Sequence, residues 1–274
     1  MEKAIQLIKA LTGANSVRLL PCGDSAIFSF LAVAKKIGKR KVIIPDQGGW
    51  FGFKRYASIL DFDIISLKTK EALIIPEILE NHADEDSCMI YQNPGGYFVA
   101  QPIEDIWNVC KKHECLLCLD ITGSIGSRND FSDYADFIFS SFGRWKIINL
   151  GYGGFIGSSR YKLNEFRDVF RMFKTNFCCM ENKLYSLISR ANERYKKLHE
   201  LAEKTAKELA AKGFEVIHRD RLGINVCVRF KDDNELKALK EFCASNGFEY
   251  VECPFNPRID AKALSIELKR KEIL

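Results

Sequence analysis

The feature that most constrains the fold is an alternation of short apolar segments with helical segments, up to Phe139. The apolar segments are near-continuous runs of Val, Ile, Leu and Phe, which are typical of strands buried on both faces of a parallel sheet. The predicted strands are 17–20, 41–45, 62–67, 87–91, 116–120 and 135–139, and the predicted helices are 1–13, 24–38, 55–60, 76–80 and 102–113. This order predicts an α/β fold with a mostly parallel sheet covered by helices.

The pattern changes beyond Arg160. A long charged segment, 181–212, has helical spacing and ends at Gly213. The segments that follow are predicted as strands 215–218 and 225–230, helix 235–245, and strands 248–252 and 263–268. We therefore expect a small α+β domain over residues 181–274, which the long helix joins to a large domain over residues 1–180.

Composition restricts the class of partner. The net charge is +5 and 28% of residues are charged, with basic and acidic side chains interspersed, which is ordinary for a soluble globular protein. The densest basic clusters, 35–41 and 269–271, are predicted to be solvated faces, so we expect no nucleic-acid partner. No apolar run is as long as a membrane span, and the N-terminal segment has the spacing of an amphipathic helix, so we expect a cytoplasmic protein with no membrane partner.

The ten cysteines favour buried free thiols. Most lie in apolar surroundings, where a thiol behaves as a small hydrophobic group. A metal site formed by Cys110, His113, Cys115 and Cys118 is the alternative. Strand alternation places Cys115 and Cys118 on opposite faces, so we expect no metal there.

Ligands of open parallel sheets bind beyond the carboxyl ends of the strands. The loops predicted at this edge follow residues 20, 45, 91 and 119. The first contains a turn at Gly23, followed by a helix that Asp24 or Ser25 is predicted to cap. Free backbone N–H groups at such a helix end can bind an anion, although an ordinary capped helix explains the same residues.

The segment SSFGRWKIINLGYGG, residues 140–154, places Lys146 between a predicted strand and a glycine-rich turn. In a cleft of apolar residues a lysine is partly desolvated, which favours the neutral amine that attacks carbonyl carbon in Schiff-base chemistry. A surface lysine is the simpler alternative. Asp120 ends a buried strand and needs a cation, such as a protonated pyridine nitrogen. Ser141 and the Gly23 turn can together hold a phosphate, and Trp50 can lie over an aromatic ring.

Three motifs resemble fold-type-I enzymes that use pyridoxal 5'-phosphate (PLP), most closely the DegT-type sugar aminotransferases. SFGRWKIINLGYGG resembles the motif that carries the internal-aldimine lysine, which assigns that role to Lys146 and a phosphate contact to Ser141. LDITGSIG is similar to the segment whose aspartate pairs with the pyridine nitrogen, which assigns Asp120. CGDSAIFSFLA resembles the phosphate turn and its helix, which assigns residues 23–25 to the phosphate region.

Further residues follow from this resemblance. NPGGYFVAQPIEDI is similar to the segment in which an asparagine, here Asn93, bonds the ring hydroxyl of the cofactor. Trp50 or Phe51 matches the aromatic that stacks on the ring. Two positions depart from the family: Asp24 replaces a usual threonine, and Gly123 replaces a usual histidine or glutamine.

The resemblance implies a PLP-dependent aminotransferase that acts on an amino acid or amino sugar. Lys146 would serve as general base on the substrate α-carbon, while Asp120 keeps the ring nitrogen protonated. Arg258 is the first candidate for binding a substrate carboxylate, and Arg144 is the second. Active sites of this family form at a dimer interface, so the resemblance also implies a homodimer.

Three other functions stay open. A lyase or desulfurase of the same fold needs a nucleophilic loop cysteine, for which Cys178, Cys179 and Cys253 are candidates. A non-catalytic protein can retain the fold for binding. A nucleotide-binding site is less favoured, because GYGGFIG lacks the G-x-G-x-x-G spacing.

Overall fold

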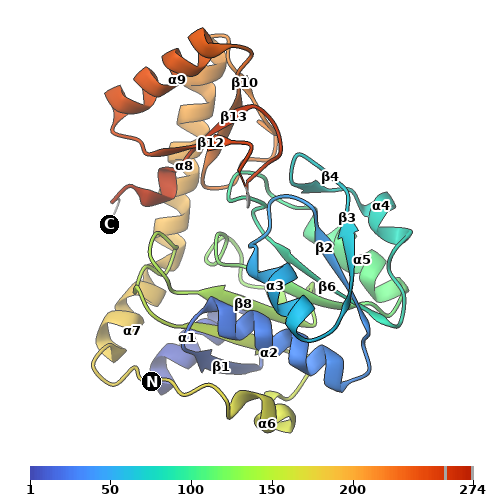
Figure 1. Ribbon diagram of the computed structural model, residues 1–274. Helices are drawn as coiled ribbons and strands as arrows, with labels where there is room; N and C mark the ends of the chain where they lie inside the picture. Colours follow the sequence, from blue (N-terminus) through green and yellow to red (C-terminus); the bar gives the residue numbers. More distant parts are fainter. Residues whose placement is uncertain (256–257, 273–274) are drawn as a thin grey trace.

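The computed structural model describes residues 1–255 and 258–272, which form a large and a small β-sheet with helices around them (Figure 1). The large sheet has seven strands in the order β1-β9-β8-β7-β6-β2-β3. They are β1 (Ser16–Leu20), β2 (Lys41–Pro45), β3 (Asp63–Leu67), β6 (Ser87–Gln92), β7 (Leu116–Asp120), β8 (Phe137–Ser141) and β9 (Gly154–Ser158). Strands β8, β7, β6, β2 and β3 pair in parallel, which confirms the predicted α/β fold with a mostly parallel sheet.

Strand β9 was not predicted from the sequence. It pairs antiparallel with both β1 and β8, so those two strands run in the same direction. Glycine opens β9 at Gly154 and recurs at Gly157, and glycine is depleted in strands. A side chain at Gly154 would lie 2.7 Å from the Ser140 carbonyl oxygen, so this strand needs glycine where it lies close to its neighbour.

Helices cover both faces of the large sheet. Met89 and Leu117 point to the face covered by α1 (Glu2–Thr12), α5 (Ile103–Lys112) and α7 (Glu181–Ser189), and α4 (Pro76–Glu80) also packs there. Their neighbours Cys88 and Leu116 point to the face covered by α2 (Gly23–Lys36), α3 (Gly52–Ile59) and α6 (Arg167–Phe170). The period-two alternation of buried side chains therefore explains why the strands are apolar throughout.

The small sheet contains four antiparallel strands in the order β10-β11-β13-β12. They are β10 (Glu215–Val216), β11 (Val226–Arg229), β12 (Tyr250–Cys253) and β13 (Ala263–Ile266), and they pack with α8 (Ala191–Ala211) and α9 (Asp233–Asn246). The helix predicted over 181–212 is two helices, because α7 ends before Arg190 and α8 begins after it. Helix α8 extends from the large sheet to the small one (Figure 1).

The remaining elements are short. A hairpin joins β4 (Thr69–Lys70) to β5 (Leu73–Ile74), and there are 3-10 turns η1 (Phe131–Asp133), η2 (Leu163–Phe166) and η3 (Leu268–Arg270). Within residues 1–255 and 258–272, no helix has the length and apolar character needed to cross a membrane. The same residues contain no cluster of His, Cys, Asp or Glu placed to hold a metal ion.

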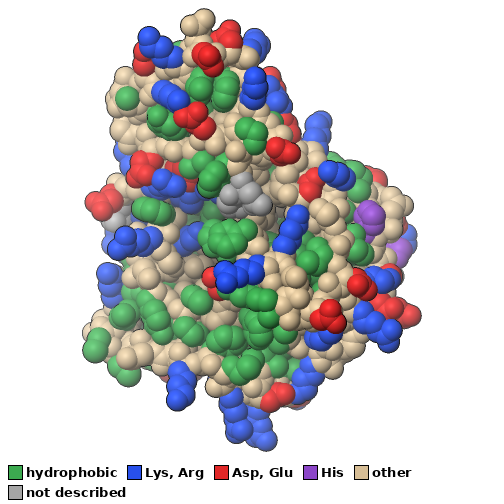
Figure 2. Space-filling model, in the orientation of Figure 1, with side chains coloured by type: hydrophobic (Ala, Val, Ile, Leu, Met, Phe, Trp, Pro, Cys, Tyr) green, Lys and Arg blue, Asp and Glu red, His purple; other side chains and the backbone are tan. Residues whose placement is uncertain are grey.

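One surface of the large-sheet half carries apolar side chains. Figure 2 shows them over α2 and between α2 and α6. Phe28 of α2 lies edge-on to Tyr56 and Phe173, and Ile59 and Met172 are well exposed. Contiguous exposed apolar groups of this kind favour contact with another surface.

Candidate active site

A cavity of about 530 Å³ lies at the carboxyl ends of the parallel strands. Residues from the loops after β1, β2, β6, β7 and β8 line one side of it, and residues next to β12 and β13 line the other. The predicted site residues that line it are Gly23, Asp24, Trp50, Asp120, Ser141, Lys146, Arg144 and Arg258. Eight of the predicted site residues therefore meet at the edge of the sheet that the sequence indicated.

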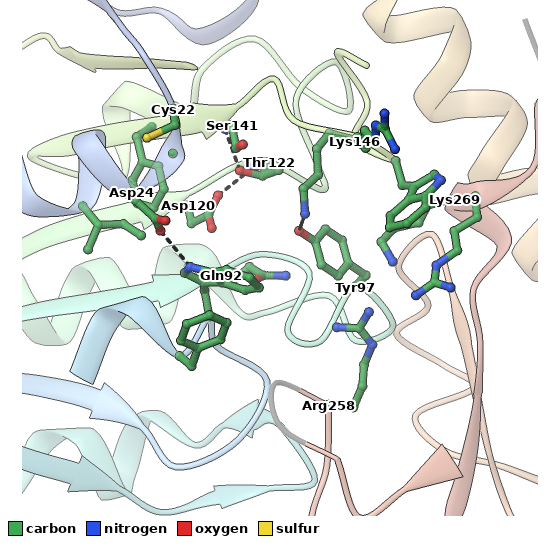
Figure 3. Close-up of a pocket in the computed structure, with 18 of the residues that line it drawn as sticks. Cys22, Asp24, Gln92, Tyr97, Asp120, Thr122, Ser141, Lys146, Arg258 and Lys269 are labelled. Atoms are coloured by element: carbon green, nitrogen blue, oxygen red, sulfur yellow. Dashed lines mark hydrogen bonds between the residues drawn. The ribbon is translucent and has the colours of Figure 1, made fainter. Parts of the chain in front are cut away.

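Lys146 lies in the loop that joins β8 to β9. Its side chain points across the cavity, and Nζ lies 2.5 Å from the hydroxyl oxygen of Tyr97 (Figure 3). The loop is anchored by Ile147 and Ile148, which are fully buried in the core. Trp145 has a φ of 61°, and its amide donates to Asn149 Oδ1 at 2.9 Å, which closes the turn. The turn directs the amine of Lys146 into the cavity while its neighbours fill the core.

Asp120 ends β7 and is only 5% exposed. Its Oδ1 accepts a hydrogen bond from the Thr122 amide at 2.8 Å. Burial nevertheless raises the pKa of this carboxyl from 3.8 to about 6, and the Thr122 bonds and the charge of Lys146 offset only part of the effect. Among the residues that the structure describes, the positive charge near Asp120 is therefore too small to offset the cost of burying its ionised form.

The turn at Gly23 packs directly on Ser141. A Cβ atom at Gly23 would lie 2.8 Å from the Ser141 Cβ, so only glycine allows the backbone to approach this closely. The prediction that Asp24 or Ser25 caps α2 is wrong for Asp24, whereas Ser25 takes part in the cap as the third residue of a capping box. The N-cap is Cys22, whose Sγ accepts from the Ser25 amide, while the Ser25 hydroxyl bonds the Cys22 backbone.

Asp24 and Trp50 form a pair at the cavity wall. The indole Nε1 of Trp50 donates to Asp24 Oδ1 at 2.8 Å (Figure 3). The Trp50 ring also packs on Phe51, with 4.1 Å between ring centroids. The indole thus binds the Asp24 carboxylate, at the position where the family that the sequence resembles usually has threonine.

Two predicted site residues do not line the cavity. Ser25 is buried and bonds its own turn, as described above. The Asn93 side-chain oxygen accepts from the Gln101 amide at 2.9 Å, and the Asn93 carbonyl accepts from the Ser124 hydroxyl. Gln92, one residue earlier at the end of β6, lines the cavity instead.

Arg258 is placed at the cavity but is engaged by the protein. It is 6% exposed, and its guanidinium donates two hydrogen bonds to Glu267, at 2.9 and 2.8 Å. The amine of Lys269 also bonds Glu267, and burial lowers the Lys269 pKa to about 7. The two cations compensate the charge of Glu267 and hold the Glu267 pKa below its ordinary value. Arg144, by contrast, is exposed at the mouth.

The sequence prediction missed several polar residues that line the cavity, among them Tyr97, Thr122 and Lys269. The first two lie within the NPGGY and LDITG motifs, close after strand ends, and that position is a usable signal. Lys269 belongs to a basic cluster that was predicted to be solvated. That prediction is wrong for Lys269, which is 4% exposed, because η3 folds it against Glu267.

Comparisons with known proteins support the architecture. No protein-family model matches the sequence, and no curated protein matches it significantly. A Sphingomonas wittichii serine palmitoyltransferase is similar in structure, with a TM-score of 0.73, 16% identity, and coverage of 97% of this chain and 69% of that one. Ureidoglycine-glyoxylate aminotransferase from Bacillus subtilis has a TM-score of 0.67 at 15% identity, covering 97% and 78% of the two chains.

A third similar structure is that of Oryza sativa TDC solved with PLP and tryptamine. Its TM-score is 0.72 at 14% identity, and the match covers 99% of this chain and 71% of that one. The similar proteins differ in the reactions their names state, so the likeness is one of fold. The chain has the PLP-transferase-like fold, with its cavity at the carboxyl edge of the sheet.

Proposed function

We propose that the chain is a PLP-dependent enzyme, and more specifically an aminotransferase of the DegT type that acts on an amino acid or amino sugar. The observation that carries the proposal is the joint placement of Lys146 and Asp120 in one cavity beside the Gly23 turn. The amine of Lys146 can react with an aldehyde. The buried Asp120 carboxylate, which is short of positive charge, can pair with a pyridinium nitrogen, and the close backbone approach at Gly23 can bind a phosphate.

The residues present fit the cofactor chemically. A protonated ring nitrogen would supply the positive partner that Asp120 lacks, since burial alone raises its pKa to about 6. A phosphate would bind at the N-terminus of α2, where the backbone at Gly23 comes within contact of Ser141. Asp24 does not oppose this fit as strongly as its charge suggests, because Trp50 binds its carboxylate. Trp50 is the proposed stacking aromatic, and Gln92, which lines the cavity, is proposed to make the polar contact that the sequence assigned to Asn93.

Bound PLP supplies an aldehyde that condenses with amines and a ring that accepts electrons from the adjacent substrate carbon. The chain's own groups then have defined tasks. Asp120 Oδ atoms would hold a proton at the ring nitrogen. Lys146 Nζ would take the proton from the substrate α-carbon and deliver it to the carbon of the cofactor's former aldehyde group, which is the exchange that transamination needs. Trp50 and Tyr97 line the cavity, where their rings would shield the reacting atoms from water.

The substrate contact has two proposed contributors. Arg258 already donates to Glu267, so it can offer a substrate carboxylate only the guanidinium donors that this pair leaves free. Arg144 is exposed at the mouth of the cavity and can reach a group that enters from outside.

We also propose a homodimer, which the exposed apolar surface around Ile59 and Met172 supports. Sedimentation of the protein at micromolar concentration tests that proposal directly.

The test of the cofactor is the visible absorbance of the purified protein with added PLP. We expect a band in the wild type that is absent from Lys146→Ala. Lys68→Ala is the matched control, because Lys68 is 82% exposed and should leave the band unchanged. Borohydride reduction followed by peptide mass analysis should place the cofactor on Lys146. A band of equal strength in Lys146→Ala, or label spread over surface lysines, would contradict the proposal.

A second candidate function is a lyase or desulfurase, which the exposure of Cys22 at the cavity favours. Cys178 and Cys179 are also exposed, but they do not line the cavity as the described residues form it. Cys253 is buried in β12. Release of sulfide from cysteine, lost in Cys22→Ser, would support the desulfurase. Formation of a 2-oxo acid that is unaffected by Cys22→Ser would support the aminotransferase.

A further inference from the structure

The amine of Lys146 has one side-chain hydrogen-bond partner among the described residues, the hydroxyl of Tyr97, at 2.5 Å. Tyr97 lies in the loop after β6 and is only 6% exposed. Figure 3 shows the two side chains directed toward each other across the cavity. Lys146, which is proposed to transfer a proton, is therefore bonded to the Tyr97 hydroxyl, a group that can both donate and accept a hydrogen bond.

The backbone around Tyr97 is fixed at several points. Its φ is 70°, a conformation that a tyrosine adopts only when its surroundings impose it. The Tyr97 amide donates to the Pro94 carbonyl at 3.0 Å, and its carbonyl accepts from the amides of Ile224 and Asn225 at 2.9 Å each. A side chain at Gly223 would lie 2.5 Å from that carbonyl oxygen, so glycine is required there too.

The ring of Tyr97 fills the space above Gly123. A Cβ atom at Gly123 would lie 2.8 Å from Tyr97 Cδ1 and 2.9 Å from Pro94 Cδ. Gly123 is one of the two positions at which this chain departs from the family it resembles, and the Tyr97 ring lies where a side chain at position 123 would begin. The ring occupies the volume that a larger residue at position 123 would need.

Two further basic side chains lie near the ring with no hydrogen bond to its hydroxyl. The Lys269 amine lies 4.6 Å from the ring centroid, and the Arg258 guanidinium lies 5.2 Å from it. Cations at such distances are attracted to the ring face. These contacts hold the ring, and the hydroxyl is left to bond Lys146.

We propose that Tyr97 is the positioning residue of Lys146, whose ε-amino group it keeps directed into the cavity in both protonation states. As an ammonium, Nζ donates to the Tyr97 oxygen. After Nζ has given up a proton, its lone pair accepts a hydrogen bond from the Tyr97 O–H. The pair then has one proton fewer, which is the proton that Lys146 exchanges. The role in turnover rests on the proposed function, whereas the contact itself does not.

The test uses Tyr97→Phe, which removes the hydroxyl and keeps the ring with its cation contacts. Tyr91→Phe is the matched control, because Tyr91 is fully buried and its hydroxyl has no hydrogen-bond partner within the described residues. The first readout needs no cofactor: the rate of acetylation of Lys146 by acetic anhydride across pH, measured by mass spectrometry with Lys68 as internal reference. The bond to the Tyr97 hydroxyl restrains the amine and occupies it, so we expect Lys146 to be acetylated about 3- to 10-fold faster at pH 7 in Tyr97→Phe.

The second readout is turnover of the PLP-loaded protein. We expect kcat to fall about 10- to 100-fold in Tyr97→Phe with KM within about twofold, because orientation of the base is lost and substrate contacts are kept. Gly123→Ala is a second variant that displaces the ring while leaving the hydroxyl, and it should increase acetylation in the same direction. Wild-type acetylation rates and pH profile in Tyr97→Phe would overturn the proposal. Absence of a Lys146-dependent band would instead overturn the proposed function, and the acetylation result would still stand.

Discussion

Replacement of Asp120 by Asn tests whether the buried carboxylate destabilises the cofactor-free protein and pairs with a positive charge on the bound cofactor. Burial raises the Asp120 pKa from 3.8 to about 6 in the folded chain. A rise of that size corresponds to about 3 kcal/mol by which folding disfavours the ionised form at pH 7. The folded-state pKa lies above the unfolded one, so the protonated group stabilises the fold below pH 3.8, and that advantage is lost between pH 3.8 and about 6.

Asp120→Asn should therefore stabilise the cofactor-free protein at pH 7 by up to about 3 kcal/mol and have little effect at pH 4. The asparagine oxygen can still accept from the Thr122 amide. Urea unfolding at the two pH values measures the difference. With PLP the sign should reverse, because the variant cannot pair with a protonated ring nitrogen, and we expect cofactor affinity to fall about 100-fold.

Asp136→Asn is the control for this comparison. Burial also raises the Asp136 pKa, and Asp136 Oδ2 accepts from the Leu117 amide at 2.8 Å, but the residue lies outside the cavity lining described above. It should gain stability in the same direction without changing PLP affinity. If Asp120→Asn destabilises the cofactor-free protein at pH 7 while Asp136→Asn stabilises it, Asp120 is satisfied by the protein itself and the reasoning fails.

Three further predictions concern the cavity walls. Gly23→Ala should lower PLP affinity about tenfold or more in a titration, since its Cβ would meet Ser141 at 2.8 Å; unchanged affinity would place the phosphate elsewhere. Glu267→Gln leaves Arg258 and Lys269 without their shared counter-charge and should cost about 3–5 kcal/mol in urea unfolding; a loss below about 1 kcal/mol would refute a buried ion pair. Burial lowers the Lys269 pKa from 10.5 to about 7, so the folded chain binds fewer protons than the unfolded chain between these values and the melting temperature should rise with pH across that window. Lys269→Met should flatten that slope, and an unchanged slope would argue against the assignment.

The sequence predicted the parts of the fold that depend on local pattern. Continuous apolar strands and capped helices identified most of the large sheet and the edge at which Lys146 and Asp120 meet. Strand β9 escaped because glycines that allow close packing also weaken a strand signal. The cap of α2 escaped because a thiol at Cys22 takes the place of the usual hydroxyl or carboxylate.

The residues that the sequence misjudged are defined by contacts between distant segments. Lys269 looked solvated because nothing in its neighbourhood along the chain shows that Glu267 and η3 will bury it. Asn93 lies one residue away from the cavity because its side chain bonds the Gln101 amide. Tyr97 could be located near a strand end, but its bond to Lys146 joins residues 49 apart in the chain.

The carbonyl of Tyr97 also links the loop after β6 to the small sheet. It accepts hydrogen bonds from the amides of Ile224 and Asn225, which lead into β11. Nearby, the Ala100 amide donates to the Arg221 carbonyl at 2.7 Å. The loop that carries the hydroxyl partner of Lys146 is thus tethered to both sheets. A rotation of one sheet relative to the other would strain these hydrogen bonds. The direction of the Lys146 amine is therefore coupled to the angle between the two sheets.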